Sequence, residues 1–325
     1  IEQLKSIGIE MKVITGDNEL VTRKICEESN IEIKGTLTSQ EFENLTDLEL
    51  IEKIPNITIF ARFSPMQKER VINLLKKANY VVGYMGDGIN DSPSLKAADI
   101  GISVSNAVDV AKETADLILT QKDLTTLTTG VIEGRKTFGN TMKYIHMGLS
   151  SNFGNMFSVL IASLFLPFLP MLPIQILLNN FLYDLSQLTI PTDNVDQEYL
   201  LTPKRWSLSS INKFMLIFGP ISSIFDLLTF GTMLFIFKAN ASTFQTAWFM
   251  ESLATQTLII YFIRTRKIPF VQSSPSIYLF LSIIICVAVG WIIPFTNWGN
   301  LLGFSQLSIP MFLALIILTL FYMVS

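Results

Sequence analysis

The chain has 325 residues, of which 50% are apolar and 16% are charged. Soluble proteins usually carry a charged share of about a quarter, so membrane segments are the first expectation. The formal net charge of −3 gives no support for nucleic-acid binding. The two cysteines, Cys26 and Cys286, lie far apart in regions of opposite character, so neither a disulfide framework nor a metal cluster is indicated.

Charged residues are unevenly placed along the chain. They are dense from Ile1 to about Lys143 and sparse beyond, where they cluster between long apolar runs. A soluble region over residues 1–140 is therefore expected to precede a membrane region over residues 141–325. No signal peptide precedes the soluble part and the chain opens directly on an amphipathic stretch, so we expect a piece of a longer protein.

Short β-prone runs alternate with helical patterns in the soluble region, which predicts a parallel α/β sheet. The expected strands are Met11–Thr15, Ile57–Ala61, Tyr80–Met85, Ile100–Val104 and Leu117–Leu119. In open parallel sheets ligands collect beyond the carboxyl ends of the strands, so the residues just after these runs are the ones to inspect for chemistry.

The first run is followed by Gly16, Asp17 and Asn18 and then by a helical stretch. The free N–H groups at the start of that helix, together with the Thr15 hydroxyl, could hold a phosphate. Read alone, Asp17 or Asn18 is more often simply the cap of a helix after a tight turn.

The second run is followed by a segment in which Pro65 suits the first turn of a helix. Lys68 then lies near the start of that helix and could reach back over the strand ends. Read alone, such a lysine is usually just a solvated residue.

The third run is followed by Gly86-Asp87-Gly88-Ile89-Asn90-Asp91, the strongest local signal in the chain. Glycines let the backbone bend tightly, and an oxygen-only ligand set suits a hard cation such as Mg²⁺. A calcium loop or a plain turn are the other readings, but the alternating acids and closing glutamate of an EF-hand are missing.

Thr15, Lys68 and Asp87, in this order along an alternating α/β pattern, resemble the haloacid-dehalogenase phosphotransferase superfamily. Within it, Met85–Leu95 is similar to the hinge motif of P-type ATPases, and Ile14–Asn18 is similar to their threonine motif. The soluble region is therefore expected to be the C-terminal part of a haloacid-dehalogenase-like, Rossmann-like phosphorylation domain.

The resemblance implies a role for each matched position. The implied phosphoryl-binding residues are Thr15, Gly16, Asp17 and Lys68, and the implied pocket for a catalytic Mg²⁺ is Asp87, Asn90 and Asp91. Positioning and charge neutralisation by lysine and metal would then carry phosphoryl transfer. ATP would be bound largely by a nucleotide domain that this sequence does not contain.

One departure from the family bears on activity. The Asp-Lys-Thr-Gly-Thr segment, whose aspartate P-type pumps phosphorylate, is not in the sequence. In the family it lies upstream, before the nucleotide domain. The chain by itself is therefore expected to be inactive.

Six apolar stretches are the expected membrane helices, and most are long enough to span a bilayer. They are Tyr144–Leu166, Leu172–Ile190, Phe214–Phe237, Phe244–Ile263, Ile277–Ile293 and Ser308–Met323. Buried helices of a soluble domain are the alternative, but little polar sequence remains to cover so much apolar surface.

Basic residues give the orientation of these helices. They gather before the first span, between the second and third, and after the fourth, whereas the opposite loops carry only Lys238. The positive-inside rule then places the soluble part and the C-terminus in the cytosol. The expected location is the plasma membrane, which the chain would cross several times.

Placing polar side chains inside membrane spans costs free energy, so their presence indicates function. Asn152 and Asn155 share a helix face in the first span, with Ser151 beside them, and Asn180 and Asp184 share a face in the second. These four side chains are expected to converge on a transported cation. Hydrogen bonding between helices is the alternative use of the amides.

Two acids in later spans, Asp226 and Glu251, either contribute to the same site or pair with polar neighbours.

Ser151–Asn155 and Asn180–Asp184 are similar to the ion-binding motifs of calcium pumps, with Asn155 in place of an acid and Tyr183 in place of a threonine. Fewer anionic ligands suit Mg²⁺, which keeps several waters. The chain resembles the bacterial magnesium-transporting type IIIB P-type ATPases in three stretches: Ser103–Glu113, Leu178–Gln187 and Ile190–Asp196.

The expected function is ATP-driven Mg²⁺ transport through an aspartyl phosphate in the complete protein, with the lipid bilayer as surroundings and no obligate protein partner. Calcium or proton pumping is the nearest alternative. A non-catalytic membrane fragment and a membrane-tethered phosphatase are the alternatives of other classes.

Overall fold

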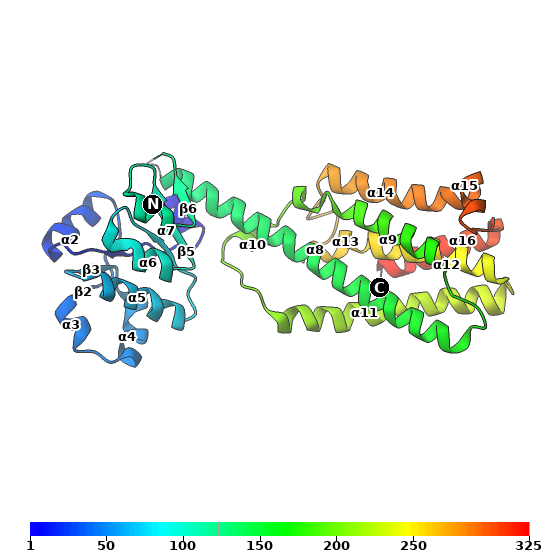
Figure 1. Cartoon of the computed structure of the whole chain (residues 1–325), viewed down its shortest axis with the longest axis horizontal. Helices are drawn as coiled ribbons and strands as arrows, with labels where there is room; N and C mark the ends of the chain where they lie inside the picture. The colour runs from blue at the N-terminus through cyan, green and yellow to red at the C-terminus, as the bar shows by residue number, and fades with distance from the viewer. Residues whose placement is uncertain (122–123, 325) are drawn as a thin grey trace. The chain divides into compact units, whose positions relative to one another are not determined.

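The computed structural model describes residues 1–121 and 124–324, so Ser325, the end of the expected membrane region, lies outside the described residues. The chain divides into two compact units, and the division falls inside the long helix α8. The first unit is Ile1–Gly134 with Leu200–Pro203, and the second is Arg135–Tyr199 with Lys204–Ser325. Strands and short helices build the first unit and long helices the second (Figure 1).

The first unit alternates strands and helices, as the sequence predicts. Its strands are β1 (Val13–Ile14), β2 (Thr36–Thr38), β3 (Ile59–Ala61), β4 (Gly83–Met85), β5 (Ile100–Val104) and β6 (Leu117–Leu119). Its helices are α1 (Glu2–Ser6), α2 (Glu19–Glu28), α3 (Ser39–Glu43), α4 (Asp47–Lys53), α5 (Pro65–Lys77), α6 (Ser92–Ala97) and α7 (Asp109–Thr114). Short 3₁₀ turns are η1 (Ile54–Asn56) and η2 (Ile89–Asp91).

All strand pairs in these sheets are parallel, which confirms the predicted α/β class. The strands form two three-stranded sheets, ordered β1-β3-β2 and β4-β5-β6, where a single sheet was expected. All five predicted runs contain a strand, but β2 was not predicted. The sequence of β2, Thr-Leu-Thr, holds a single apolar residue, so no apolar run marks it as a strand.

Helix α5 contributes to the cores beside both sheets. Val71 and Leu74 pack in a cluster with Phe60 of β3, and Ile72 packs in another with Tyr84 of β4. The start of α5 is fixed by a capping box between Ser64 and Gln67, with Pro65 at the first helical position. Lys68 directly follows Gln67, so the cap of α5 fixes where Lys68 lies on the helix.

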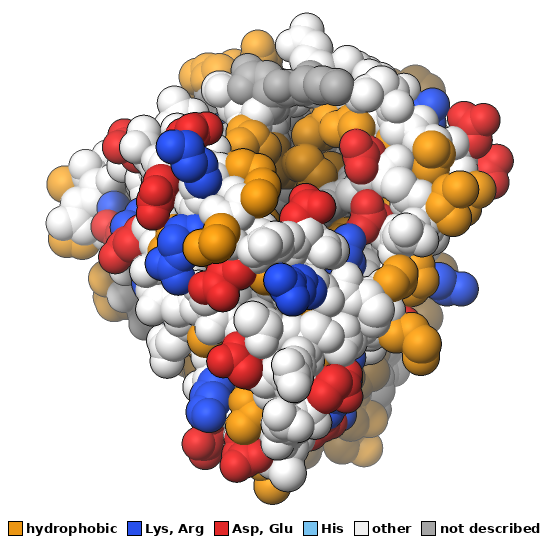
Figure 2. All heavy atoms as spheres, turned by 90° about the vertical axis from the view of Figure 1, so that its left-hand side faces the viewer, with side chains coloured by type: hydrophobic (Ala, Val, Ile, Leu, Met, Phe, Trp, Pro, Cys, Tyr) orange, Lys and Arg blue, Asp and Glu red, His pale blue; other side chains and the backbone are white. Residues whose placement is uncertain are grey.

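The surface of the first unit carries acidic and basic side chains interspersed, as Figure 2 shows for one face. This mixed pattern agrees with the soluble character expected for the region.

The second unit is helical. Its helices are α8 (Leu124–Phe165), α9 (Pro173–Gln187), α10 (Gln197–Leu200), α11 (Leu208–Gly231), α12 (Ala241–Leu258), α13 (Ile260–Ile263), α14 (Ile277–Ile292), α15 (Asn297–Leu301) and α16 (Ile309–Val324). Short 3₁₀ or π-helical turns are η3 (Ile190–Thr192), η4 (Thr232–Ile236) and η5 (Ile293–Phe295). Each of the six predicted apolar stretches overlaps a long helix.

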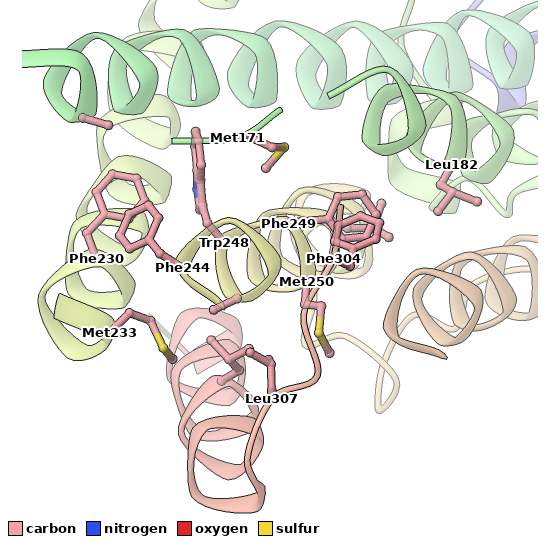
Figure 3. Packing of buried hydrophobic residues seen from close by; sticks show 14 residues of the cluster. Met171, Leu182, Phe230, Met233, Phe244, Trp248, Phe249, Met250, Phe304 and Leu307 are labelled. Carbon is pink, nitrogen blue, oxygen red and sulfur yellow. The ribbon is translucent and has the colours of Figure 1, made fainter. Parts of the chain in front are cut away.

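Helix α12 is the centre of this unit, because every residue from Phe244 to Thr257 is buried. Figure 3 shows Phe244 and Trp248 of this helix packed against Phe230 of α11. Leu208–Ile236 and Ile277–Phe295 are long and apolar enough to cross a membrane by length and composition. Ile309–Val324 is a shorter apolar helix.

Candidate functional site

Thr15 follows β1 and is held by backbone hydrogen bonds to the end of β3. Its N–H donates to the Phe60 carbonyl at 2.9 Å, and its carbonyl accepts from the Phe63 N–H at 2.9 Å. The Thr15 hydroxyl donates to the Asp17 carboxylate at 3.1 Å and accepts from the Asp17 N–H at 3.1 Å. These contacts place the threonine motif directly beside the residue that precedes the N-cap of α5.

Asn18 caps α2, since its side chain accepts from the Leu20 N–H at 2.9 Å. Asn18 is therefore a helix cap, which is the alternative interpretation expected from the sequence. It leaves the Thr15 hydroxyl and the exposed Gly16 and Asp17 as the polar groups at this strand end.

Lys68 contacts the loop that follows β4. Its Nζ lies 2.9 Å from Oδ1 of Asp91, and both side chains are 13% exposed. The same Asp91 oxygen accepts from the Tyr84 hydroxyl at 2.8 Å, and Oδ2 accepts from the Gly88 N–H at 3.2 Å. The second and third motifs of the sequence thus meet in one site.

The Asp91 carboxyl is held in its charged form. Burial raises the pKa of Asp91, but the Lys68 ammonium and the Tyr84 hydroxyl outweigh burial and bring the pKa below its usual value. For Tyr84, burial first and the hydrogen bond to Asp91 second raise the pKa of the phenol well above its usual value. Lys68 therefore meets a carboxylate and a neutral phenol.

The turn after β4 is drawn tight around the Asp91 side chain. A Cβ added to Gly86 would lie 2.5 Å from Cβ of Asp91, so only glycine fits there. The Gly86 carbonyl accepts from the Ser103 hydroxyl at 2.9 Å, and the Asp87 carbonyl accepts from the Val108 N–H at 3.1 Å. These bonds tie the turn to β5 and to the start of α7.

Asp87 and Asn90 present exposed side chains, whereas Asp91 is half-buried. An exposed carboxylate and amide at the end of a parallel strand fit a hard cation such as Mg²⁺. Asp91 fits less well as a direct ligand, because its oxygens already accept from Lys68, Tyr84 and Gly88. Its contacts suit a residue that positions Lys68.

The four membrane side chains expected to converge on a cation do not share one environment. Asn152 of α8, and Asn180 and Asp184 of α9, are all exposed. The inward face of α9 is instead made by Asn179, Leu182 and others that are buried. Asn180 follows Asn179 by one residue, which turns its side chain by about 100° around the helix, away from α12 and α14.

Asn155 is the member of the expected set that points into the bundle. Its Nδ2 donates to Oε1 of Gln256 at 2.9 Å, and its Oδ1 accepts from the Ser252 hydroxyl at 3.3 Å. The Ser151 hydroxyl also donates to Gln256 Oε1, at 3.1 Å, and Gln256 Nε2 donates to Asn179. This network joins α8, α9 and α12 through amides, so these side chains hydrogen-bond between helices, the alternative to ion binding.

Sequence reasoning missed Gln256 and Asn179, although an amide inside an apolar stretch is itself a signal. It also missed Tyr84, which gives no such signal because a tyrosine in a strand usually belongs to the hydrophobic core.

The other three membrane residues singled out from the sequence, Tyr183, Asp226 and Glu251, are buried. Tyr183 is buried and its hydroxyl has no hydrogen-bond partner among the described residues. Asp226 and Glu251 are buried on α11 and α12, where Asp226 accepts from Ser158 and Trp248. Asp226 therefore pairs with polar neighbours, which is one of the two alternatives expected from the sequence.

Comparisons with known proteins agree with both units. A family model for haloacid dehalogenase-like hydrolases matches residues 66–126, and a model for the C-terminus of cation transporting ATPases matches residues 168–325. A phosphotransferase-type α/β unit followed by such a helical unit defines the class. The chain belongs to the P-type cation-transporting ATPases.

Among curated relatives, the chain is 50% identical over 96% of its length to "Magnesium-transporting ATPase, P-type 1" of Escherichia coli strain K12. It is 49% identical over 99% of its length to the protein of that name in Salmonella typhimurium strain LT2. A calcium-transporting ATPase 1 of Bacillus cereus is 33% identical over 71% of the chain. The chain spans 35% to 36% of the length of the two magnesium-transporting relatives.

Proposed function

We propose that this chain supplies half of the phosphoryl-transfer site and the C-terminal membrane helices of an ATP-driven Mg²⁺ pump that works through an aspartyl phosphate. The observation that carries the proposal is the contact of Lys68 with Asp91, which joins two motifs 23 residues apart at one strand end. Magnesium is favoured over calcium because identity to the magnesium-transporting relatives is 50%, against 33% for the calcium-transporting one.

In this proposal the residues of the first unit position charge. Lys68, held by Asp91 at 2.9 Å, neutralises an oxygen of the transferred phosphoryl group. The Thr15 hydroxyl donates a hydrogen bond to the same group, and this bond replaces the one that it makes to Asp17. Mg²⁺, when bound, supplies further positive charge, and Asp87 with Asn90 would hold it.

The transported ion is assigned to α8 and α9. Asp184 provides the negative charge, and Asn152 and Asn180, exposed like it, provide amide oxygens. Asn155 stays in the amide network with Gln256 and orients α8. A further part of this proposal is a plasma-membrane location with the first unit and the C-terminus in the cytosol and six membrane-spanning helices.

Variants of the complete protein in lipid vesicles test both halves. Lys68→Ala and Asp87→Asn are expected to lower Mg²⁺-stimulated ATP hydrolysis at least about 100-fold, since each removes charge stabilisation of the transition state. Asp184→Asn is expected to lower Mg²⁺ uptake while phosphorylation by inorganic phosphate continues. Asp109→Asn, at a side chain 93% exposed, is the matched control.

Unchanged uptake in Asp184→Asn would refute the ion site and leave the phosphoryl site standing. Unchanged hydrolysis in Lys68→Ala would refute the phosphoryl site. Stimulation by Ca²⁺ in place of Mg²⁺ would favour the calcium-pump alternative.

A further inference from the structure

Two carboxyl groups face each other inside the helical unit. Asp226 of α11 is 1% exposed and Glu251 of α12 is 0% exposed. Trp248 of α12 donates to Asp226 and lies three residues before Glu251, so Glu251 is on the face of α12 that contacts Asp226. An arrangement of two acids in contact, away from water, needs a physical explanation.

The neighbours of the two acids differ. Asp226 accepts two hydrogen bonds, from the Ser158 hydroxyl at 2.5 Å and from the Trp248 indole N–H at 2.7 Å. Both oxygens of Glu251 are buried without a donor among the described residues. Asp226 is thus surrounded by donors that stabilise a negative charge, and Glu251 is not.

No lysine, arginine or histidine forms an ion pair with either acid in the part of the chain that the structure describes. The titratable group that faces them from a packed helix is Tyr322 of α16, a phenol, which interacts electrostatically with both. Helix α8 faces them with Ser158, and α11 itself adds the buried Thr229. None of these groups carries positive charge.

Two adjacent carboxylates without a cation cannot both stay ionised in such a site, because burying even one unpaired charge costs several kcal/mol. One bound proton removes a charge and supplies the missing donor: a protonated Glu251 donates to Asp226. Glu251 is then satisfied, and Asp226 has its third donor.

A divalent cation fits the site less well than a proton. Mg²⁺ requires about six oxygen ligands. Both Asp226 oxygens already accept hydrogen bonds. No group of three or more Asp, Glu, His or Cys side chains suited to a metal occurs within residues 1–121 and 124–324.

We propose that Asp226 and Glu251 form a proton-binding site in the helical unit, in which one proton is shared at neutral pH and Glu251 is its carrier. The site lies on α11 and α12, and the proposal does not depend on which cation the protein transports. It gives the bundle a group that can release a proton when water or a cation gains access.

Infrared spectroscopy of the complete protein in lipid vesicles tests this directly, because a protonated carboxyl has a carbonyl stretch distinct from that of a carboxylate. The wild-type minus Glu251→Gln difference spectrum at pH 7 is expected to contain one protonated-carboxyl band. The difference against Glu198→Gln, an acid 71% exposed, is expected to contain none. Glu251→Gln should fold normally, since an amide can donate to Asp226 as the protonated acid does.

Asp226→Asn is the second variant and covers the case in which Glu251→Gln fails to fold. Its spectrum should keep the band at a shifted frequency, because Glu251 remains protonated beside an amide. Absence of the band from the wild type at pH 7 would overturn the proposal. Loss of the band on addition of Mg²⁺ alone, at constant pH, would also overturn it by making the pair a cation site.

Discussion

Asp91 makes contacts that its motif alone does not suggest. The motif implies a magnesium ligand, whereas the side chain lies between Lys68, Tyr84 and the Gly88 N–H. A lysine on a long flexible stem loses considerable conformational freedom when it is fixed in one place. The carboxylate fixes it before any phosphoryl group arrives, so the entropy is lost during folding and not during the reaction.

The stabilising effect of Asp91 should depend on pH. Its folded-state pKa is below its usual value, so the stabilisation is present above the unfolded-state value of about 3.9 and is lost as the pH falls through the lower folded-state value. Asp91→Asn is expected to lower stability by about 2 kcal/mol at pH 7, because the hydrogen bonds to a charged acceptor weaken. Melting temperatures in detergent, measured from pH 3 to pH 8, should show the gap between the two proteins closing below about pH 4. A constant gap across this range would show that Asp91 acts without its charge.

Gly86 is the residue that allows Asp91 to pack where it does. Gly86→Ala places a methyl group 2.5 Å from Cβ of Asp91 and should displace the carboxylate from Lys68. A loss of about 1–3 kcal/mol is expected from this overpacking, measured by thermal unfolding. Gly130→Ala is the control, since nothing lies within 4 Å of the added Cβ on an exposed position of α8, and it should stabilise by up to about 1 kcal/mol. Equal melting temperatures for the two variants would contradict the packing argument.

At the scale of elements, the loop after α9 is organised by one buried carboxylate. Asp193 Oδ2 accepts from Lys143 Nζ of α8 at 2.6 Å and from Arg264 Nε, after α13, at 2.8 Å. Its Oδ1 accepts from the Ser276 N–H, before α14, at 2.9 Å. One side chain therefore joins four parts of the helical unit. Lys143 and Arg264, two of the basic residues behind the positive-inside prediction, are thus buried in ion pairs.

Removing one partner of this cluster should be costly. Arg264→Met deletes its hydrogen bonds to Asp193 and to three backbone carbonyls, and leaves Asp193 with one buried cation. A loss of about 3–5 kcal/mol is expected, since breaking a buried pair strands a charge. Thermal unfolding in detergent measures it.

Lys267→Met is the matched control for the arginine variant. Its ion pair with Glu198, at 3.0 Å, is partly exposed, so a loss below about 1 kcal/mol is expected. A similar loss in both variants would mean that burial does not strengthen the Asp193 cluster.

At the scale of the molecule, the two units bury different surfaces. In the first unit, charged residues cover compact apolar cores. In the second, polar residues such as Thr246, Glu251 and Gln256 are buried, while large apolar side chains such as Phe165, Phe235 and Phe321 are exposed. This inversion is what a bilayer requires, since apolar side chains contact lipid and polar ones must find partners inside.

The proposed topology makes a prediction about sidedness. A cysteine at Leu169, which is 60% exposed in the loop between α8 and α9, should react with an impermeant thiol reagent added outside intact cells. A cysteine at Pro203, exposed before α11, should react only in inverted vesicles. The two cysteines of this chain, Cys26 and Cys286, are buried, so they should add little background labelling. Labelling of both positions from the same side would refute the arrangement of spans.

The sequence by itself determined the class of fold, five of the six strands in their order, and the loops that the structure brings together at Lys68 and Asp91. These features are local: strand runs, capping residues such as Ser64 and glycine turns act over a few residues, and motif resemblance reads the same short range. Short-range patterns were therefore enough to assign the hinge loop and Lys68 to the same chemistry.

Only the tertiary structure decided which side chains meet. Helical spacing predicts that Asn180 and Asp184 share a face, but which face turns inward depends on packing against α12 and α14, and the buried face begins one residue earlier. The pairing of Asp226 with Glu251 and the cluster around Asp193 join residues tens of positions apart. No local pattern encodes such contacts, because they arise from the free energy of burying whole helices against one another.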